Sequence, residues 1–281
     1  MKKTLLVILT LGFIFSFAFA KEMMPATNLK EMPVLMEDQV PVDPSTVFPT
    51  VQTRTAPEYT FSKLPTAIIT NYYDYMIGSY NGLPLRIIPD VAGGGYFMSY
   101  HGRRQPTSTR RAFYAYIDAQ GNVVNNNEIT SVQNNEGYAT VSVDPVSGKP
   151  LYAWHCNTDA DGEYEVQFAS DAFIAGISGL FNDLQVTIDN PYTITSPSGV
   201  TTTANEFIWP TAQIGPSPVA GKRRVYLAAR NSVYETYGPS ENLMVAFADF
   251  DGNDVENGVP LVWSQVSIPE MNDWNVDDQW R

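Results

Sequence analysis

Residues 137–171, GYATVSVDPVSGKPLYAWHCNTDADGEYEVQFASD, decide the fold. Two of its segments alternate between apolar and polar residues, and the segment between them is a dense run of apolar and aromatic residues. Such short runs, bounded by Pro, Gly, Asn and Asp, are typical of antiparallel strands joined by tight turns. The stretch therefore predicts three short strands, at residues 137–144, 151–155 and 164–169.

The same plan occurs before and after this stretch. Each unit is a strand, a loop and a second strand that ends near an Asp, and a further candidate strand precedes each unit. The paired strands lie at residues 96–101 and 113–118, 151–155 and 164–171, and 225–230 and 243–249. The preceding strands lie at residues 85–88, 138–143 and 206–209, and a fourth unit is predicted to begin at residues 261–264.

This repetition predicts an all-β fold, a β-propeller-like repeat of antiparallel blades that is incomplete, with three to four blades. Loop length varies between blades while the sheets stay similar, so unequal spacing fits a propeller. A β-sandwich is the alternative, because it too has short strands at regular spacing. Residues 172–184 are the best candidate for a helix, although two glycines weaken it.

The composition is consistent with one large all-β domain or two small domains. The 281 residues are 44% hydrophobic and 12% aromatic, enough to bury a sizeable core. The formal net charge of −13 repels polyanions, so we expect no nucleic-acid partner. The single cysteine, Cys156, excludes an intrachain disulfide, and its place among strand residues gives no sign of a nucleophile.

The N-terminus predicts a secreted protein. Residues 1–20 have a basic start, an apolar run and small residues at positions 18 and 20, which is typical of a signal peptide cleaved after Ala20. An uncleaved anchor is the competing interpretation, but the segment is short for a membrane span. We expect a secreted, cell-surface or periplasmic protein with no membrane span after cleavage.

Residues 21–70 are predicted to form a Pro-rich linker or an extended arm, because prolines recur every few residues. The β-propeller-like domain is then expected to span residues 71–281. No closing strand is evident at its C-terminal end. The sequence therefore predicts a fragment of a longer protein, an open array of sheets, or an array closed by a partner.

Residues 80–270 resemble the secreted bacterial sialidase-like, BNR-repeat propeller superfamily in the pattern of their blades. The superfamily's Asp-box is approached most closely by residues 142–148, SVDPVSG, which have two extra residues before Gly148 and no following Thr. The resemblance implies a propeller that can support glycoside hydrolysis. It implies no catalytic residue in this chain.

The sharpest local motif is a candidate Ca²⁺ loop. Oxygen-bearing side chains at alternating positions, followed by Gly162, can point at one centre; they belong to Asn157, Asp159 and Asp161. Asp249 and Asp251 form a weaker second candidate. The alternative is that these residues simply make tight turns between strands.

The candidate ligand-binding residues lie at matching strand ends and are Tyr100, His101, Trp154, His155 and Arg230. In equivalent blades they would lie at one level of the structure, where aromatic and hydrogen-bonding groups suit a glycan or an extracellular protein. The alternative is packing between blades. Four loop arginines, at positions 103, 104, 110 and 111, could bind a carboxylate or could pair with nearby acids.

The sequence contains no HExxH, GxSxG or P-loop motif. We therefore expect a secreted or surface-associated binding or structural β-propeller that recognises glycan or protein. One alternative is a sialidase-like glycoside hydrolase, and another is a structural segment of a larger extracellular adhesin.

Overall fold

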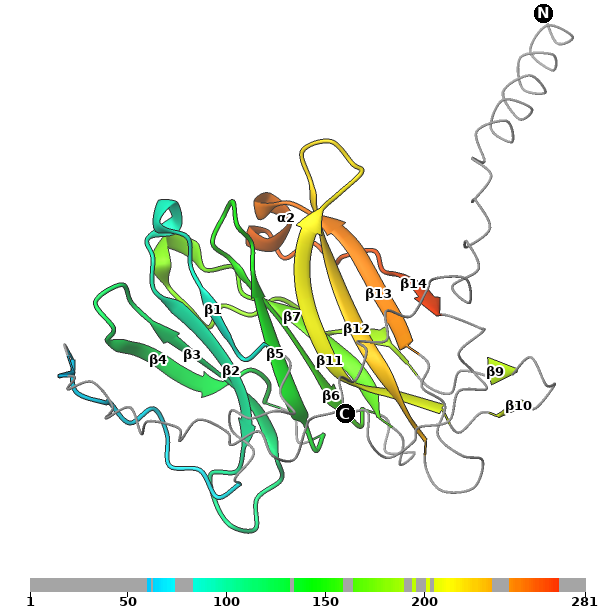
Figure 1. Ribbon diagram of the computed structural model, residues 1–281, viewed down its shortest axis with the longest axis horizontal. Coiled ribbons are helices and arrows are strands. Elements are labelled where there is room, and N and C mark those ends of the chain that lie inside the picture. The colour runs from blue at the N-terminus through cyan, green and yellow to red at the C-terminus, as the bar shows by residue number, and fades with distance from the viewer. Residues whose placement is uncertain are drawn as a thin grey trace, which may run out of the picture. The chain divides into compact units, whose positions relative to one another are not determined.

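Three antiparallel sheets of four strands each follow one another along the chain (Figure 1). The computed structural model describes residues 60–61, 63–73, 83–131, 134–158, 164–189, 194–195, 201–202, 205–233 and 243–267. The predicted signal peptide, residues 21–59 and the end of the chain lie outside these residues. Phe61–Arg281 form one compact unit.

Each sheet is a meander in which every strand pairs with its neighbour in the sequence. Sheet 1 contains β1 (Leu85–Ile87), β2 (Tyr96–Gly102), β3 (Arg111–Ile117) and β4 (Val123–Glu128). Sheet 2 contains β5 (Gly137–Val143), β6 (Pro150–Cys156), β7 (Glu165–Ser170) and β8 (Gln185–Ile188). Sheet 3 contains β11 (Asn205–Pro216), β12 (Arg223–Val233), β13 (Leu243–Phe250) and β14 (Ser264–Ser267).

The remaining described elements are short. Strands β9 (Ile194–Thr195) and β10 (Thr201–Thr202) pair with each other, and the helices are η2 (Asp90–Ala92), η3 (Ile174–Gly176) and α2 (Gly252–Glu256). The all-β prediction is therefore confirmed. The described sheets are open, and none closes on itself.

Two sequence predictions are wrong. Ser264 does not belong to a fourth unit, because β14 pairs antiparallel with β13 and completes sheet 3. Residues 172–184 do not form a helix beyond the three residues of η3, because Phe173 and Ala175 adopt left-handed backbone conformations with φ of 42° and 53°. The Asp171 carboxylate instead accepts hydrogen bonds from backbone N–H groups of this loop.

Apolar side chains join neighbouring sheets face to face. Phe97 and Tyr114 of sheet 1 share a buried core with Trp154 of sheet 2. On its other face, sheet 2 packs Phe168 against Leu227 of sheet 3. Burial of this apolar surface is the main force that holds the sheets together.

The outer face of sheet 1 carries a third buried cluster. It consists of Met98, Tyr100, Phe113 and Ala115, and Ile68 and Ile69 pack against it. The described end of the segment predicted as a linker or arm therefore packs on the first sheet.

The Asp at the end of each repeated unit has a structural role. Asp118, Asp171 and Asp251 directly follow the third strand of their sheets, and each carboxylate accepts a hydrogen bond from a backbone N–H of the next turn. The donor–acceptor distances are 2.7, 2.9 and 2.8 Å. An Asp that satisfies backbone donors favours a turn, which explains its repetition at this point.

The Asp-box-like segment forms the β5–β6 turn and ties sheet 2 to sheet 3. Asp144 is fully buried and accepts hydrogen bonds from Ser147 N, at 3.1 Å, and from Arg223 Nε on β12, at 2.7 Å. Burial alone would raise the pKa of Asp144, but these hydrogen bonds outweigh it and lower the pKa. The turn therefore fixes the position of one sheet against the next.

Candidate functional site

Six rings gather where the second strands of sheets 1 and 2 end and where β5 and β11 begin. This aromatic–histidine cluster consists of Tyr73, His101, Tyr138, His155, Tyr164 and Trp209. The centroids of neighbouring rings are 4.9 to 5.9 Å apart. The two histidines are buried, and the other four side chains are half-buried. The cluster thus combines four half-buried aromatic rings with two buried histidines.

Two β-bulges aim central rings into the cluster. The register of β5 shifts between Gly137 and Thr140, and that of β11 shifts between Ile208 and Thr211. The bulged residues Tyr138 and Trp209 have φ of 52° and 53°. Left-handed backbone is unfavourable for a bulky side chain, and such strain, about 1–3 kcal/mol per residue, clusters at functional sites.

Both histidines are neutral. His101 Nδ1 accepts a hydrogen bond from Tyr138 N at 2.7 Å, and burial, together with the charge of Arg110, lowers the pKa of His101 to about 3. Burial, then Arg110 and His101, hold the pKa of His155 well below its ordinary value. Weak bases of this kind are poorly suited to proton transfer near neutral pH, but they can form hydrogen bonds.

Arg110 determines which nitrogen of His155 carries the proton. Its Nη2 lies 3.4 Å from His155 Nε2, and a guanidinium can only donate, so Nε2 is the acceptor and Nδ1 carries the hydrogen. Gly137 is required beside this contact, because a Cβ there would lie 2.7 Å from Nε2. The Arg110 guanidinium also donates to Glu136 O, at 2.6 Å, and to Tyr73 Oη, at 3.2 Å.

Cationic groups flank the outer part of the cluster. The guanidinium carbons of Arg103 and Arg110 lie 5.3 and 5.6 Å from the centroid of the Tyr73 ring. Cation–π contacts of this kind stabilise the ring by about 0.5–1 kcal/mol at exposed positions. Two of the four loop arginines therefore belong to this site.

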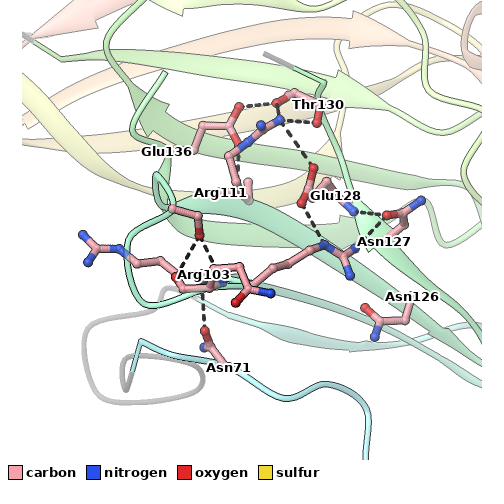
Figure 2. A network of polar contacts seen from close by, with 12 residues as sticks. Asn71, Arg103, Arg111, Asn126, Asn127, Glu128, Thr130 and Glu136 are labelled. Carbon is pink, nitrogen blue, oxygen red and sulfur yellow. Dashed lines mark hydrogen bonds and ion pairs between the residues drawn. The ribbon is translucent and has the colours of Figure 1, made fainter. Parts of the chain in front are cut away.

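The other two loop arginines pair with acids (Figure 2). Arg104 Nε lies 2.9 Å from Glu128, and Arg111 Nε lies 3.3 Å from the buried carboxylate of Glu136. Glu136 also accepts from Ala112 N at 2.7 Å, and burial raises its pKa. Arg111 thus joins Thr130 and Glu136, as Figure 2 shows, and it directly follows Arg110 in the chain.

The predicted ligand-binding residues divide between two environments. His101 and His155 lie in the cluster, 4.9 Å on either side of Tyr138. Tyr100 stacks on Phe113 in the outer core of sheet 1, and Trp154 lies in the core between sheets 1 and 2.

Arg230 pairs in register with Ile208, the residue before Trp209. It occupies in sheet 3 the position that His101 and His155 occupy in sheets 1 and 2. The structure adds four rings that the sequence did not indicate, and it brings two of the four loop arginines beside them. The rings are Tyr73, Tyr138, Tyr164 and Trp209, and the arginines are Arg103 and Arg110.

The predicted calcium ligands are only partly described. Asp159 and Asp161 lie outside the described residues, and Asn157 N donates to Asn134 O at 2.9 Å. Asp249 forms an ion pair with Arg224 at 2.7 Å, and this contact lowers the pKa of Asp249 to about 2. Asp251 caps α2.

Among the described residues, no group of three or more His, Cys, Asp or Glu side chains could hold a metal ion. Cys156 is buried, and burial raises the pKa of its thiol. No helix in the described part of the chain is long and apolar enough to cross a membrane.

A shallow cleft lies at the opposite end of sheet 3. Its volume is about 430 Å³, and an ion pair between Lys222 and Asp254, 2.9 Å apart, forms part of its lining. Val219, Val259 and Val262 make the rest largely apolar. The cleft has none of the aromatic rings that define the aromatic–histidine cluster.

Fold and cluster together define an all-β protein of successive four-stranded antiparallel sheets with a ring-lined site at one end. The chain matches no protein-family model, no curated protein and no solved structure. The geometry of the described residues therefore carries the functional argument.

Proposed function

We propose that this protein is a secreted β-propeller-like binding protein that recognises a glycan at the aromatic–histidine cluster. Successive four-stranded meanders that pack face to face are what the blades of a propeller require. The first strands of the sheets also contact one another, as they would around a propeller axis. Val141 N donates to Leu83 O at 3.3 Å, and Ala212 N donates to Thr140 Oγ1 at 3.2 Å.

Equivalent positions in the three sheets support the blade interpretation. Tyr138 and Trp209 bulge opposite Trp154 and Ala229, and the same register places Leu83 opposite Tyr100. The residue at this position has positive φ in each sheet. It is Leu83 just before β1, Tyr138 on β5 and Trp209 on β11. The next residues on the second strands are His101, His155 and Arg230.

The single observation that carries the binding proposal is the chain of half-buried aromatic rings that alternates with two buried, neutral histidines. Sugar rings present C–H groups that pack on aromatic faces, and their hydroxyls need donors and acceptors close by. The cluster combines both in one place. An extracellular protein is the second candidate, because Tyr, Trp and Arg also dominate protein interfaces.

The hydrolase alternative is less well supported by this site. A glycosidase uses two carboxyl groups across the scissile bond. Glu136, the described acid next to Arg110, is committed to Arg111 and Ala112 N. We therefore favour binding without catalysis.

Binding can be tested with a glycan array followed by calorimetric titration of the best soluble oligosaccharide. Tyr138→Asn and Trp209→Asn remove the rings, and Asn tolerates left-handed backbone well. Each should weaken binding by about tenfold or more, the loss of one ring contact. Tyr96→Asn, at a ring outside the cluster, is the matched control. Unchanged affinity in both cluster variants would refute the proposal.

Secretion and calcium binding remain predictions. If the protein is secreted with cleavage after Ala20, N-terminal sequencing of the protein recovered outside the cytoplasm should show that it begins at Lys21. A Ca²⁺ ion at Asn157, Asp159 and Asp161 would add stability between β6 and β7.

A further inference from the structure

We propose that sheet 3 of one copy of this chain packs on sheet 1 of a second copy, so that two copies join head to tail. Each sheet has two faces. The forward face packs on the next sheet in the chain, and the backward face packs on the previous one. Among the described sheets of one chain, none packs on the forward face of sheet 3 or on the backward face of sheet 1.

The middle of the forward face of sheet 3 is apolar, and an ion pair between Arg224 and Asp249 lies at one end of it. Further polar residues on the same face are Thr211, Gln213 and Ser264. Two apolar residues of this face are equivalent to residues with which sheet 2 packs on sheet 3. Tyr226 is equivalent to Leu151, and Val245 is equivalent to Phe168. Leu151 and Phe168 are buried in the core between the sheets. Tyr226 and Val245 are only half-buried, and their neighbour Val266 is 53% exposed.

The same face carries one further aromatic ring and a further small apolar residue. Phe247 pairs with Tyr226 across the strands, with ring centroids 6.3 Å apart, and Ala228 pairs with Val245. These residues belong to none of the buried clusters of the described sheets. The forward face of sheet 3 thus has the composition of an interface and no described partner.

The backward face of sheet 1 shows the matching deficit. Leu85, Ile87 and Tyr96 are 47%, 71% and 39% exposed. Their equivalents in sheet 3 are Ala212, Ile214 and Val225, which pack into the core against sheet 2. Ile68 and Ile69 cover the neighbouring part of this face but leave these three side chains exposed.

A second copy is the partner that supplies both missing surfaces. The chain already contains the forward-to-backward interface twice, between sheets 1 and 2 and between sheets 2 and 3. The two outer faces continue that series, so the uncovered part of each is the complement of the other. Two copies that meet in this way share two identical contacts and present six sheets, within the usual range of four to eight blades.

Charge gives this association a recognisable signature. Each chain carries a formal net charge of −13, so two copies repel each other at long range. Burial of apolar surface must overcome this repulsion. The dimer should therefore tighten as salt screens the charges.

The test is the mass of the purified chain in solution, measured by light scattering and sedimentation from low to high micromolar concentration. The expected mass is twice that of one chain. Ile87→Glu changes the backward face of sheet 1, and Val266→Glu changes the forward face of sheet 3. In a dimer of either variant, the changed face lies in both contacts. Each variant should therefore weaken dimerisation by about 100-fold or more, because a buried unpaired carboxylate is costly.

Mixing the two variants distinguishes head-to-tail packing from other dimers. The Ile87→Glu chain keeps an intact sheet 3 face, and the Val266→Glu chain keeps an intact sheet 1 face, so the mixture should recover a dimer through one contact. Val146→Glu, at a 64% exposed position in the β5–β6 turn, is the control and should remain dimeric. Tyr226→Lys replaces Val266→Glu if circular dichroism shows that the latter is misfolded.

A wild-type chain that stays monomeric at every concentration and salt level would overturn the inference. So would an Ile87→Glu chain that remains fully dimeric, since that result would indicate that two sheet 3 faces pack on each other. Neither Ile87 nor Val266 belongs to the aromatic–histidine cluster, so glycan binding is measured independently of this outcome.

Discussion

The buried histidines should make the stability of this protein fall as the solution is acidified below neutral pH. Burial and the charge of Arg110 lower the pKa of His101 to about 3 and hold that of His155 well below its ordinary value. In the unfolded chain both titrate near the ordinary pKa of about 6.5. Below that pH the unfolded chain takes up protons that the folded chain cannot, so acid favours unfolding.

The expected size of the effect follows from these pKa values. Each pH unit below about 6.5 costs about 1.4 kcal/mol per histidine, until the folded pKa is reached. Between pH 7 and pH 5 the loss is about 2 kcal/mol for His101, and His155 adds a further loss in the same direction. That is a large share of the 5–15 kcal/mol of a typical domain.

Urea unfolding at pH 7, 6 and 5 measures this loss directly. The matched control is the double variant His101→Gln/His155→Gln, which retains hydrogen-bonding side chains but cannot titrate. The buried carboxyls of Glu136 and Asp171 have raised pKa values, and they act in the opposite direction in both proteins. Equal losses of stability between pH 7 and pH 5 in the double variant and the wild type would show that the histidines do not cause the acid sensitivity.

Three further changes have defined outcomes. Asp144→Asn breaks the buried ion pair between sheets 2 and 3 and should cost about 3 kcal/mol in urea unfolding, whereas Asp254→Asn, in a more exposed pair, should cost less than about 1 kcal/mol. Gly179→Ala should destabilise by about 1–3 kcal/mol, because φ is 90° and the new Cβ would lie 2.2 Å from a tyrosine hydroxyl; an unchanged melting temperature would contradict this. Chelation should lower the melting temperature of the wild type by a few degrees but not that of Asp159→Ala/Asp161→Ala, and equal melting temperatures with and without chelator in the wild type would exclude a stabilising Ca²⁺ ion.

Local patterns in the sequence were sufficient to locate most strands. Residues 96–101, 151–155 and 225–230 are dense in apolar and aromatic side chains, and each forms a second strand. The fourth strands were harder to recognise. β4 contains Asn125, Asn126 and Asn127, and polar edge strands lack the alternation that reveals a half-buried strand. The sequence also places the start of β14 in a new unit, although β14 pairs with β13, because pairing between distant strands has no local signal.

Only those residues of the candidate site that occupy repeated positions could be predicted from the sequence. His101 and His155 occupy the same position in successive units, and the structure brings both into one cluster. The rings of Tyr138 and Trp209 depend on β-bulges, which a binary apolar pattern does not reveal. Tyr73 and Arg110 meet only through tertiary packing, so neither could be assigned from spacing.

The repeated backbone explains how one architecture can carry different chemistry at equivalent points. A residue with positive φ lies at the start of each sheet, as Leu83, Tyr138 or Trp209. This conformation costs about 1–3 kcal/mol for a residue with a bulky side chain, and Leu83 adopts it without an aromatic ring. The ring is therefore not needed for this backbone conformation. Tyr138→Asn and Trp209→Asn should leave the sheets intact and remove only the contacts that the rings make, and this is why they separate binding from folding.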